Sequence, residues 1–531
     1  MRATLDHHWV TARLQHGKRS VPAWLRLAVL TCAFFLLTAP KTSLGNADEP
    51  IANSRLQLRQ DFAGQLEELA NWCEQQGLAE QAEQTRHWSL PTLADKHIIY
   101  RIPSAAPALR QDSTGGDSDS SGIAEWHSRF MSLRQQQAAA LFGLLSDAVE
   151  QGHVATAFEL IYATLREQPD HAEARRLLGH VPHNGGWYSV ATKRRLEAGE
   201  LRHDRFGWLP SEHVPRYEQG ERFYRGRWIS AEREAKLRDK IARGWRIESD
   251  HFEITTNDSL ESGVALADQL EGLYNAWYQL FAAYHTTPSS LKKLVRTGKL
   301  PRRATTRHKV VYFRSREEYV LQLGKRQSGI ERSLGIYLND DRTAYFFAGE
   351  EQDPGTVLHE ATHQLFQEGA AAKRRIAQRA NVWIVEGIAC YMESLRAGSS
   401  RSGTAFDTVG GYEVARLPGA RIRLLEHNFY IQFAELVHLG GTTLRRHPQA
   451  ATIYTQAAGQ ATFLMHHGRG RYRDALVEYL RAVYSDRAGP DTLAKLAGRE
   501  YSELDLEYRQ FLLGAEVSSP AERAAAASAR P

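Results

Sequence analysis

The sequence predicts a multidomain protein in which a mainly α-helical N-terminal half is followed by an α+β domain. The chain has 531 residues, more than a single domain usually holds, and 42% of them are hydrophobic, enough for several packed cores. Apolar residues recur at helical spacing in residues 51–90 and 125–180. Short alternating runs typical of strands begin only after residue 250, and long apolar helical runs follow them, which is the order of an α+β domain.

The first 47 residues have the pattern of a secretory signal peptide. Basic residues such as Arg19 and Arg26 precede an apolar run over residues 27–39, which is too short to span a bilayer comfortably. Small residues at Gly45 and Ala47 indicate cleavage after Ala47. We therefore expect export to the periplasm, the cell surface or the medium, with an uncleaved signal anchor as the alternative.

The same segment accounts for the positive charge of the chain. It holds six basic residues against Asp6, a balance of +5, and the whole chain also carries +5. The mature protein is therefore formally neutral, and its composition gives no reason to expect a nucleic-acid or anionic-membrane partner. Once the signal is removed, no membrane span is expected. Two cysteines then remain, Cys73 and Cys390, which either pair or stay as buried thiols.

The N-terminal half is predicted to be helical. By their spacing, residues 51–90 form one helix, and residues 102–122 are rich in Ser, Gly and Asp, which indicates a solvated linker. Residues 157–174 resemble a tetratricopeptide helix pair, in which Asp170 and Glu173 have the spacing of a capping box. Fewer than two such units are present, so this region is either a plain helical scaffold or a surface for a protein partner.

A short pattern recurs between the two halves, each time with a tryptophan just after a glycine: Trp187, Trp208 and Trp228. The tryptophans are 21 and 20 residues apart, and a basic, helix-favouring stretch follows each of them. This period predicts three small units, each a strand or turn followed by a helix. The tryptophans either pack within their units or bind a glycan or peptide by stacking.

The second half combines strands and helices. Residues 251–256 and 309–313 have the composition of strands, with a helix expected over residues 260–284 between them. Residues 335–338 and 343–347 flank a polar turn and predict a hairpin. An edge strand beside a cleft can hold an extended substrate by strand addition, and this hairpin is the candidate.

Residues 356–365 carry the pattern His-Glu-x-x-His within an apolar helical run. His359 and His363 lie about one turn apart on one helix face, so both imidazoles can reach the same cation. Glu360 lies about 100° further round the helix, close enough to act on a water beside that cation. The alternative is that His359 and His363 bind no ion and are ordinary helix residues, one exposed and one in the core.

A second apolar helix, residues 381–393, places Glu386 where a core residue is expected. A buried carboxylate is costly unless it is paired or bound to a metal. Two histidines and one carboxylate, with a fourth position left open, form the ligand set of a catalytic zinc site. Gly387 would allow close backbone packing, and Glu393 either orients a ligand or is a plain polar position. The alternative for Glu386 is an ion pair with a basic residue of the preceding connector: Lys373, Arg374, Arg375 or Arg379.

The pattern His-Glu-x-x-His followed by Trp-x-x-Glu-Gly-x-Ala-x-Tyr-x-Glu resembles the gluzincin metallopeptidases, and most of all secreted bacterial proteins of the peptidase-MA type. The resemblance covers roughly residues 250–513 and implies a gluzincin-like (zincin) catalytic domain of the α+β class. It implies that His359, His363 and Glu386 bind Zn²⁺, and that Glu360 is the catalytic acid and base.

The residue that helps to stabilise the oxyanion in that family has no motif in this chain. Tyr454 lies in about the right region, and a packing tyrosine is the alternative. We therefore hypothesise an exported zinc-dependent metallopeptidase that hydrolyses peptide bonds in a peptide or protein substrate. The rival hypothesis is a secreted interaction protein whose helical and Trp-repeat modules bind partners, with a non-catalytic or vestigial metal site.

The expected organisation has five segments. They are a signal peptide (1–47), a helical region with its linker and tetratricopeptide-like pair (48–180), the Trp-containing repeats (181–244), the metallopeptidase-like domain (245–515) and a frayed tail (516–531).

Overall fold

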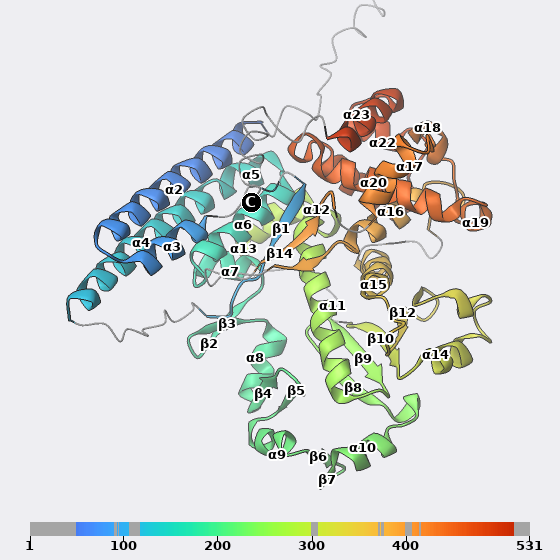
Figure 1. Cartoon of the computed structure of the whole chain (residues 1–531), viewed down its shortest axis with the longest axis horizontal. Coiled ribbons are helices and arrows are strands. Elements are labelled where there is room, and N and C mark those ends of the chain that lie inside the picture. The colour runs from blue at the N-terminus through green and yellow to red at the C-terminus, as the bar shows by residue number, and fades with distance from the viewer. Residues whose placement is uncertain are drawn as a thin grey trace, which may run out of the picture. The chain divides into compact units, whose positions relative to one another are not determined.

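Helices make up most of the structure (Figure 1). The computed structural model describes residues 49–89, 93, 95–105, 117–298, 306–369, 372, 376–398, 406–413 and 416–514. The expected signal peptide with its cleavage after Ala47, the tail over residues 516–531 and the connector residues Lys373, Arg374 and Arg375 lie outside these ranges. The described residues all belong to one compact unit, and the boundaries expected inside it, at residues 180 and 244, stay predictions.

The N-terminal half is a set of packed helices. They are α2 (Glu49–Gln75), α3 (Ala79–Trp88), α4 (Asp117–Gly143), α5 (Leu145–Gln151), α6 (Val154–Glu167) and α7 (Ala172–Leu177). One buried cluster joins Phe62, Trp88 and Phe130. A second joins Phe158 of α6 to Leu291 of the later helix α13 (Pro288–Thr297), so this half packs directly against residues of the second half.

Three details of this half differ from the prediction. Residues 51–90 form two helices, because Gly77 adopts a φ of 76°, a left-handed conformation that ends α2. The expected linker ends earlier, since α4 begins at Asp117. The expected capping box is not formed. The ring of His171 caps α7 in place of Asp170.

Three hairpins, each followed by a helix, occupy residues 181–237, as predicted. The first unit is β2 (Val181–His183), β3 (Gly186–Tyr188) and α8 (Val190–Glu197). The second is β4 (Glu200–His203), β5 (Gly207–Pro210), η1 (Ser211–His213) and α9 (Val214–Glu218). The third is β6 (Glu221–Tyr224), β7 (Arg227–Ser230) and α10 (Ala231–Leu237). Each tryptophan lies half-buried on the second strand of its hairpin. The Arg216 guanidinium of the second unit covers the Trp228 ring of the third at 4.0 Å from its centroid, so this tryptophan packs against the neighbouring unit.

A five-stranded mixed sheet opens the second half. Its strands, in spatial order, are β11 (Ile336–Leu338), β12 (Thr343–Phe347), β10 (His308–Phe313), β9 (Phe252–Thr256) and β8 (Trp245–Glu248). The three inner strands are parallel and both edge strands are antiparallel to their neighbours. The expected hairpin is therefore confirmed as β11–β12, and β11 is an edge strand as the sequence suggested.

Helices cover both faces of this sheet. On one face Phe346 packs in the largest core with α11 (Leu260–Leu280) and with α15 (Pro354–Gly369), the helix that carries the paired histidines. On the other face Phe347 packs with α14 (Arg316–Leu323). The expected helix over residues 260–284 is split into α11 and α12 (Ala282–His285).

The remaining helices stack beyond α15. They are α16 (Val382–Met392), α17 (Leu417–Leu425), α18 (Phe433–Leu436), α19 (Gly441–Arg446), α20 (Ala450–Gly470), α21 (Arg473–Tyr484), α22 (Thr492–Ala497) and α23 (Tyr501–Leu513), with short turns η2 (Ile241–Arg243) and η3 (Ile330–Arg332) earlier in the chain. A second sheet joins β1 (Lys96–Tyr100) of the N-terminal half to β14 (Phe406–Gly410), with β13 (Arg396–Ala397) at its other side. The two halves thus share a sheet, which the sequence did not reveal.

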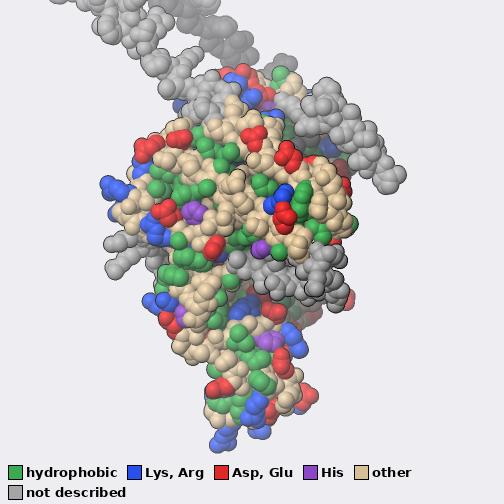
Figure 2. Space-filling model, turned by 90° about the vertical axis from the view of Figure 1, so that its left-hand side faces the viewer, with side chains coloured by type: hydrophobic (Ala, Val, Ile, Leu, Met, Phe, Trp, Pro, Cys, Tyr) green, Lys and Arg blue, Asp and Glu red, His purple; other side chains and the backbone are tan. Residues whose placement is uncertain are grey.

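The surface carries charges of both signs. On the face shown in Figure 2, acidic and basic side chains are interspersed, and basic ones gather at its lower end, where Figure 1 places the β6–β7 hairpin. Exposed arginines of that hairpin include Arg225 and Arg227. Among the described helices, none is both long enough and apolar enough to cross a membrane.

Candidate metal centre

The helix α15 begins at a polar cap and presents both histidines to the interior. The Asp353 carboxylate accepts the N–H of Thr356 at 2.8 Å, which satisfies a free donor of the first turn. Leu358, Ala361 and Leu365 are buried and fix the apolar stripe of the helix against the core.

A second helix, α16, is held unusually close to its neighbour α20. A Cβ atom at Gly387 would lie 2.6 Å from the Ala457 carbonyl oxygen, so only glycine permits this approach. Trp383, Ile384 and Ile388 are fully buried around it. The close packing of α16 against α20 leaves Glu386 on the side that faces α15.

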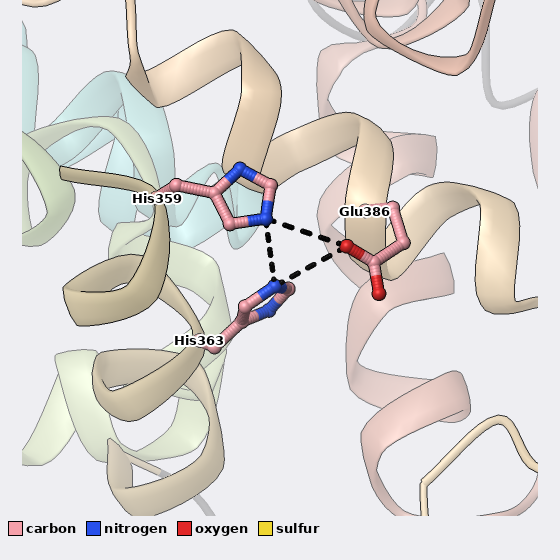
Figure 3. Close-up of side chains that lie close together, drawn as sticks. All are labelled: His359, His363 and Glu386. Carbon is pink, nitrogen blue, oxygen red and sulfur yellow. Dashed lines mark hydrogen bonds and ion pairs between the residues drawn. The ribbon is translucent and has the colours of Figure 1, made fainter. Parts of the chain in front are cut away.

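The three predicted ligands converge between α15 and α16 (Figure 3). The Nε2 atoms of His359 and His363 are 3.1 Å apart, and each lies 3.4 Å from Oε2 of Glu386. Nitrogen and oxygen ligands about 2.0–2.1 Å from a tetrahedral zinc ion lie about 3.3 Å from one another. The observed triangle therefore has the size that one such ion requires.

The charges of these three side chains are coupled to one another. Burial alone would raise the pKa of Glu386, but His363 and His359 hold it well below its ordinary value. Burial alone would lower the pKa of His359, but Cys390, Glu386 and Glu393 raise it well above its ordinary value. The three side chains thus form a buried group of two bases and one acid, and the pairing of Glu386 is with the histidines.

A second layer of contacts orients His359. Its Nδ1 lies 2.8 Å from Oε1 of Glu393, whose carboxylate also accepts N–H bonds from Arg416 at 2.9, 3.0 and 3.3 Å. An ionised carboxylate can only accept, so Nδ1 carries a proton, and Nε2 is the nitrogen that faces His363 and Glu386. Glu393 therefore orients the histidine, the first of the two alternatives that the sequence left open.

Cys390 lies beside the same histidine. Its Sγ is 3.8 Å from Nδ1 of His359, and burial raises the pKa of the thiol. Together with Glu393 these groups could also surround an ion, but Nδ1 and the Arg416 guanidinium already use the carboxylate. Cys73 and Cys390 are both free and buried, so the disulfide alternative is wrong in this structure.

Glu360 lies outside the triangle and is held by the edge strand. Its Oε2 accepts the main-chain N–H of Tyr337 in β11 at 2.9 Å. Tyr337 is directed away from β12 by the alternation of the ladder, so its carbonyl is the remaining outward group of this short strand. A further strand added at this edge would therefore bond to that carbonyl and not to the N–H.

Tyr454 lies half-buried on α20, close enough to the candidate centre for the charges there to act on its phenol. Burial and the negative charge of Glu386 raise the pKa of its phenol, and His359 and Glu360 also act on it. Its hydroxyl makes no hydrogen bond to another described residue. Its role in stabilising an oxyanion stays a prediction.

Two residues of the site were missed by sequence reasoning. Tyr337 donates its hydroxyl to Oε1 of Glu368 at 3.2 Å, besides donating its N–H to Glu360. Glu368 lies two turns beyond Glu360 on α15 and also contacts Nδ1 of His308 at 3.0 Å. Glu368 lies in the last turn of α15, where the helix dipole disfavours a negative charge. An acid at such a position was the sequence signal that could have marked Glu368 as paired.

The fold and the site together define a mainly helical protein with small mixed sheets and a candidate His/His/Glu metal centre. Residues 353–488 match the model of a family described as a protein of unknown function (DUF1570). The matched region runs from α15 through α21 and contains every ligand of the candidate centre as well as Tyr454. No curated protein and no solved structure matches the chain.

Proposed function

We propose that this protein is an exported zinc-dependent hydrolase that cleaves peptide bonds, with a gluzincin-like catalytic domain. The observation that carries the proposal is the triangle of His359, His363 and Glu386 with Glu360 beside it. Three protein ligands leave a fourth position open, as catalytic zinc sites do and closed structural sites do not. When bound there, a zinc ion would supply Lewis acidity that lowers the pKa of water and polarises a carbonyl.

Glu360 acts as the proton carrier in this proposal. The Tyr337 N–H occupies Oε2, so the carboxylate is oriented and Oε1 is left to accept a proton from water and return it to the leaving amine. Glu360 is not one of the three residues whose ligand atoms lie close enough together to share an ion, so it is free to act as an acid and base beside the ion.

The substrate in this proposal is an extended peptide. It would lie beside β11, with a substrate N–H donating to the Tyr337 carbonyl and the Tyr454 hydroxyl donating to the developing oxyanion. Export rests on the signal sequence over residues 1–47. The neutral charge of the mature chain favours no nucleic-acid partner.

The decisive experiment is Glu360→Gln in the mature full chain. We expect one zinc per protein by elemental analysis in both forms, and a loss of kcat/KM on unfolded casein of at least about a hundredfold, the usual contribution of a general base. The matched control is Glu350→Gln, an exposed acid shortly before α15, which should cleave normally.

Casein cleavage by Glu360→Gln at the rate of the unmodified protein would contradict the assignment. Stoichiometric zinc without any cleavage by the unmodified protein would favour the rival, a secreted interaction protein with a non-catalytic metal site.

A further inference from the structure

A second place in the molecule has the features of a binding site, at the opposite edge of the five-stranded sheet from β11. A cavity of about 370 Å³ lies beside β8, and all four residues of that strand, Trp245–Glu248, line it. The facing wall comes from the second and third hairpin units and includes Trp208, Leu209 and Tyr217. We call this cavity the β8 slot.

The main chain of β8 has unpaired groups that point away from β9, on the side of the slot. The Ser249 N–H donates to the Phe252 carbonyl, so Ser249 is a hydrogen-bonded position of the β8–β9 ladder. Every second residue of an antiparallel strand bonds to its neighbour, so Ile247 and Trp245 also bond to β9. The N–H and C=O groups of Arg246 and Glu248 therefore point outward. They make no hydrogen bond to another described residue.

The facing strand β5 is arranged in the same way. The Ser211 N–H bonds to the Gly199 carbonyl beyond the end of the β4–β5 ladder. Bonded pairs then fall at Leu209 and Gly207, and Trp208 directs its N–H and C=O away from β4. Trp208 lines the slot, so both walls offer main-chain donors and acceptors to whatever lies between them.

The side chains of the slot leave one positive charge without an ion-pair partner among the described residues. Arg238 pairs with Glu234, and Arg195 pairs with Glu248, but Arg246 is exposed and forms no ion pair with another described residue. An occupant that supplies a carboxylate would pair with the Arg246 guanidinium.

We propose that the β8 slot binds an extended, acidic peptide segment of another protein, which adds as a strand between β8 and β5. Strand addition uses the outward main-chain groups of Arg246, Glu248 and Trp208, and an aspartate or glutamate of the peptide pairs with the Arg246 guanidinium. The inference does not rest on the proposed hydrolase, because the slot and the metal centre lie at opposite edges of the sheet.

The test uses the full mature chain carrying Glu360→Gln, so that the probe is not cleaved. The probe is a fluorescein-labelled pentapeptide, Thr-Val-Asp-Val-Thr, with both ends blocked, and its binding is read by fluorescence anisotropy. The paired probe has the same sequence with its two valine amides N-methylated, which removes donors needed for strand pairing while the side chains stay. We expect the methylated probe to bind at least about tenfold more weakly.

Protein variants separate the main-chain from the side-chain contribution. Arg246→Pro removes an outward N–H without touching the β8–β9 ladder and should weaken binding about tenfold or more. Arg246→Ala keeps that N–H and should weaken binding about threefold, through the charge alone. Circular dichroism and zinc content confirm that both variants are folded.

Any of the following results would overturn the proposal. One is equal affinity for the plain and the methylated probe. Another is undiminished binding by Arg246→Pro, or no saturable binding by the folded parent up to about 1 mM probe. The last is slow hydrogen exchange at the Arg246 and Glu248 amides without peptide, because that would mean the edge is already paired by this chain or by a second copy of it.

Discussion

The two edges of the five-stranded sheet are treated in opposite ways. At β11 the outward N–H of Tyr337 is bonded to Glu360, and the hydroxyl of the same residue is bonded to Glu368. At β8 the outward groups of Arg246 and Glu248 meet a cavity. An exposed edge strand is a ready template for another chain, so a protein either covers it or uses it.

The difference shows what α15 does besides carrying the histidines. Two of its acids hold the edge residue Tyr337: Glu360 accepts its main-chain N–H and Glu368 accepts its hydroxyl, and we call this pair of bonds the clamp. Glu368 also accepts N–H bonds from Gln364 at 3.1 Å and from Arg342 at 3.2 Å. This fixes β11 relative to the metal centre. The β8 edge has no comparable clamp among the described residues, and Trp245 and Ile247 of this strand pack in the core with α11.

The largest effect is expected from breaking the metal centre beside the clamped edge. In Glu386→Ala the two histidines lose their acidic partner, and one of three ligands is gone. Zinc at a thousandfold excess over its Kd stabilises a protein by about 4 kcal/mol, so the unmodified chain should melt at a higher temperature with zinc. The variant should show little of this gain in a calorimetric scan.

Glu350→Ala serves as the control for that comparison, because Glu350 is exposed and lies outside the triangle. A zinc-dependent rise in Tm of the same size in Glu386→Ala would remove Glu386 from the ligand set.

Proline at an outward-facing position of each edge strand measures how well each edge is satisfied. Tyr337→Pro removes the N–H that Glu360 accepts and the hydroxyl that Glu368 accepts, and should lower the free energy of unfolding by about 2–4 kcal/mol. Arg246→Pro removes an N–H that has no partner within the described chain and should cost about 1 kcal/mol or less. Urea denaturation measures both.

Equal losses in the free energy of unfolding would mean that the outward N–H groups of β11 and β8 are equally well hydrogen-bonded, and the two edges would not differ.

The candidate metal centre was largely predictable because its determinants are local. The spacing of His359 and His363 follows from one helical turn, and Glu386 stood out as an acid in an apolar run. Their convergence, the β11–β12 hairpin and the three hairpin–helix units are all found in the structure. The identity of a bound ion and the catalytic roles of Glu360 and Tyr454 stay predictions.

What could not be predicted depends on tertiary register. The pairing of β1 with β14 joins residues about three hundred positions apart, and no local pattern encodes such a partner. The bonds from Tyr337 to Glu360 and from Arg416 to Glu393 likewise need the folded arrangement. The break at Gly77 was missed for another reason, since one glycine inside a helical pattern does not decide whether the helix ends there.

A smaller effect isolates the hydroxyl end of the clamp. Tyr337→Phe keeps the ring and the N–H bond to Glu360 but removes the bond to Glu368, and should lower the free energy of unfolding by about 1 kcal/mol. Tyr484→Phe is the matched control, because the Tyr484 hydroxyl is buried without a partner among the described residues and its loss should be neutral or stabilising. Destabilisation by Tyr484→Phe as large as that by Tyr337→Phe would mean that the loss reports general packing.

The smallest effect concerns the acid end of the clamp and its dependence on pH. Burial would raise the pKa of Glu368, but His308, Gln364 and Arg342 hold it below its ordinary value of 4.5. A carboxyl whose pKa is depressed on folding contributes stability above its ordinary pKa, and the contribution is lost as the pH falls through the folded value. The unmodified protein should therefore lose more stability on acidification below pH 4.5 than Glu368→Gln does.

Urea midpoints at pH 6, 5, 4 and 3 measure this difference, and acids elsewhere such as Glu271, whose pKa is also lowered, titrate alike in both proteins and cancel. The two profiles should converge towards low pH, because there the carboxyl of the unmodified protein is protonated and resembles the amide in charge. Parallel profiles would show that the pKa of Glu368 is the same in the folded and unfolded states, and its charge would then add nothing to the stability of the clamp at β11.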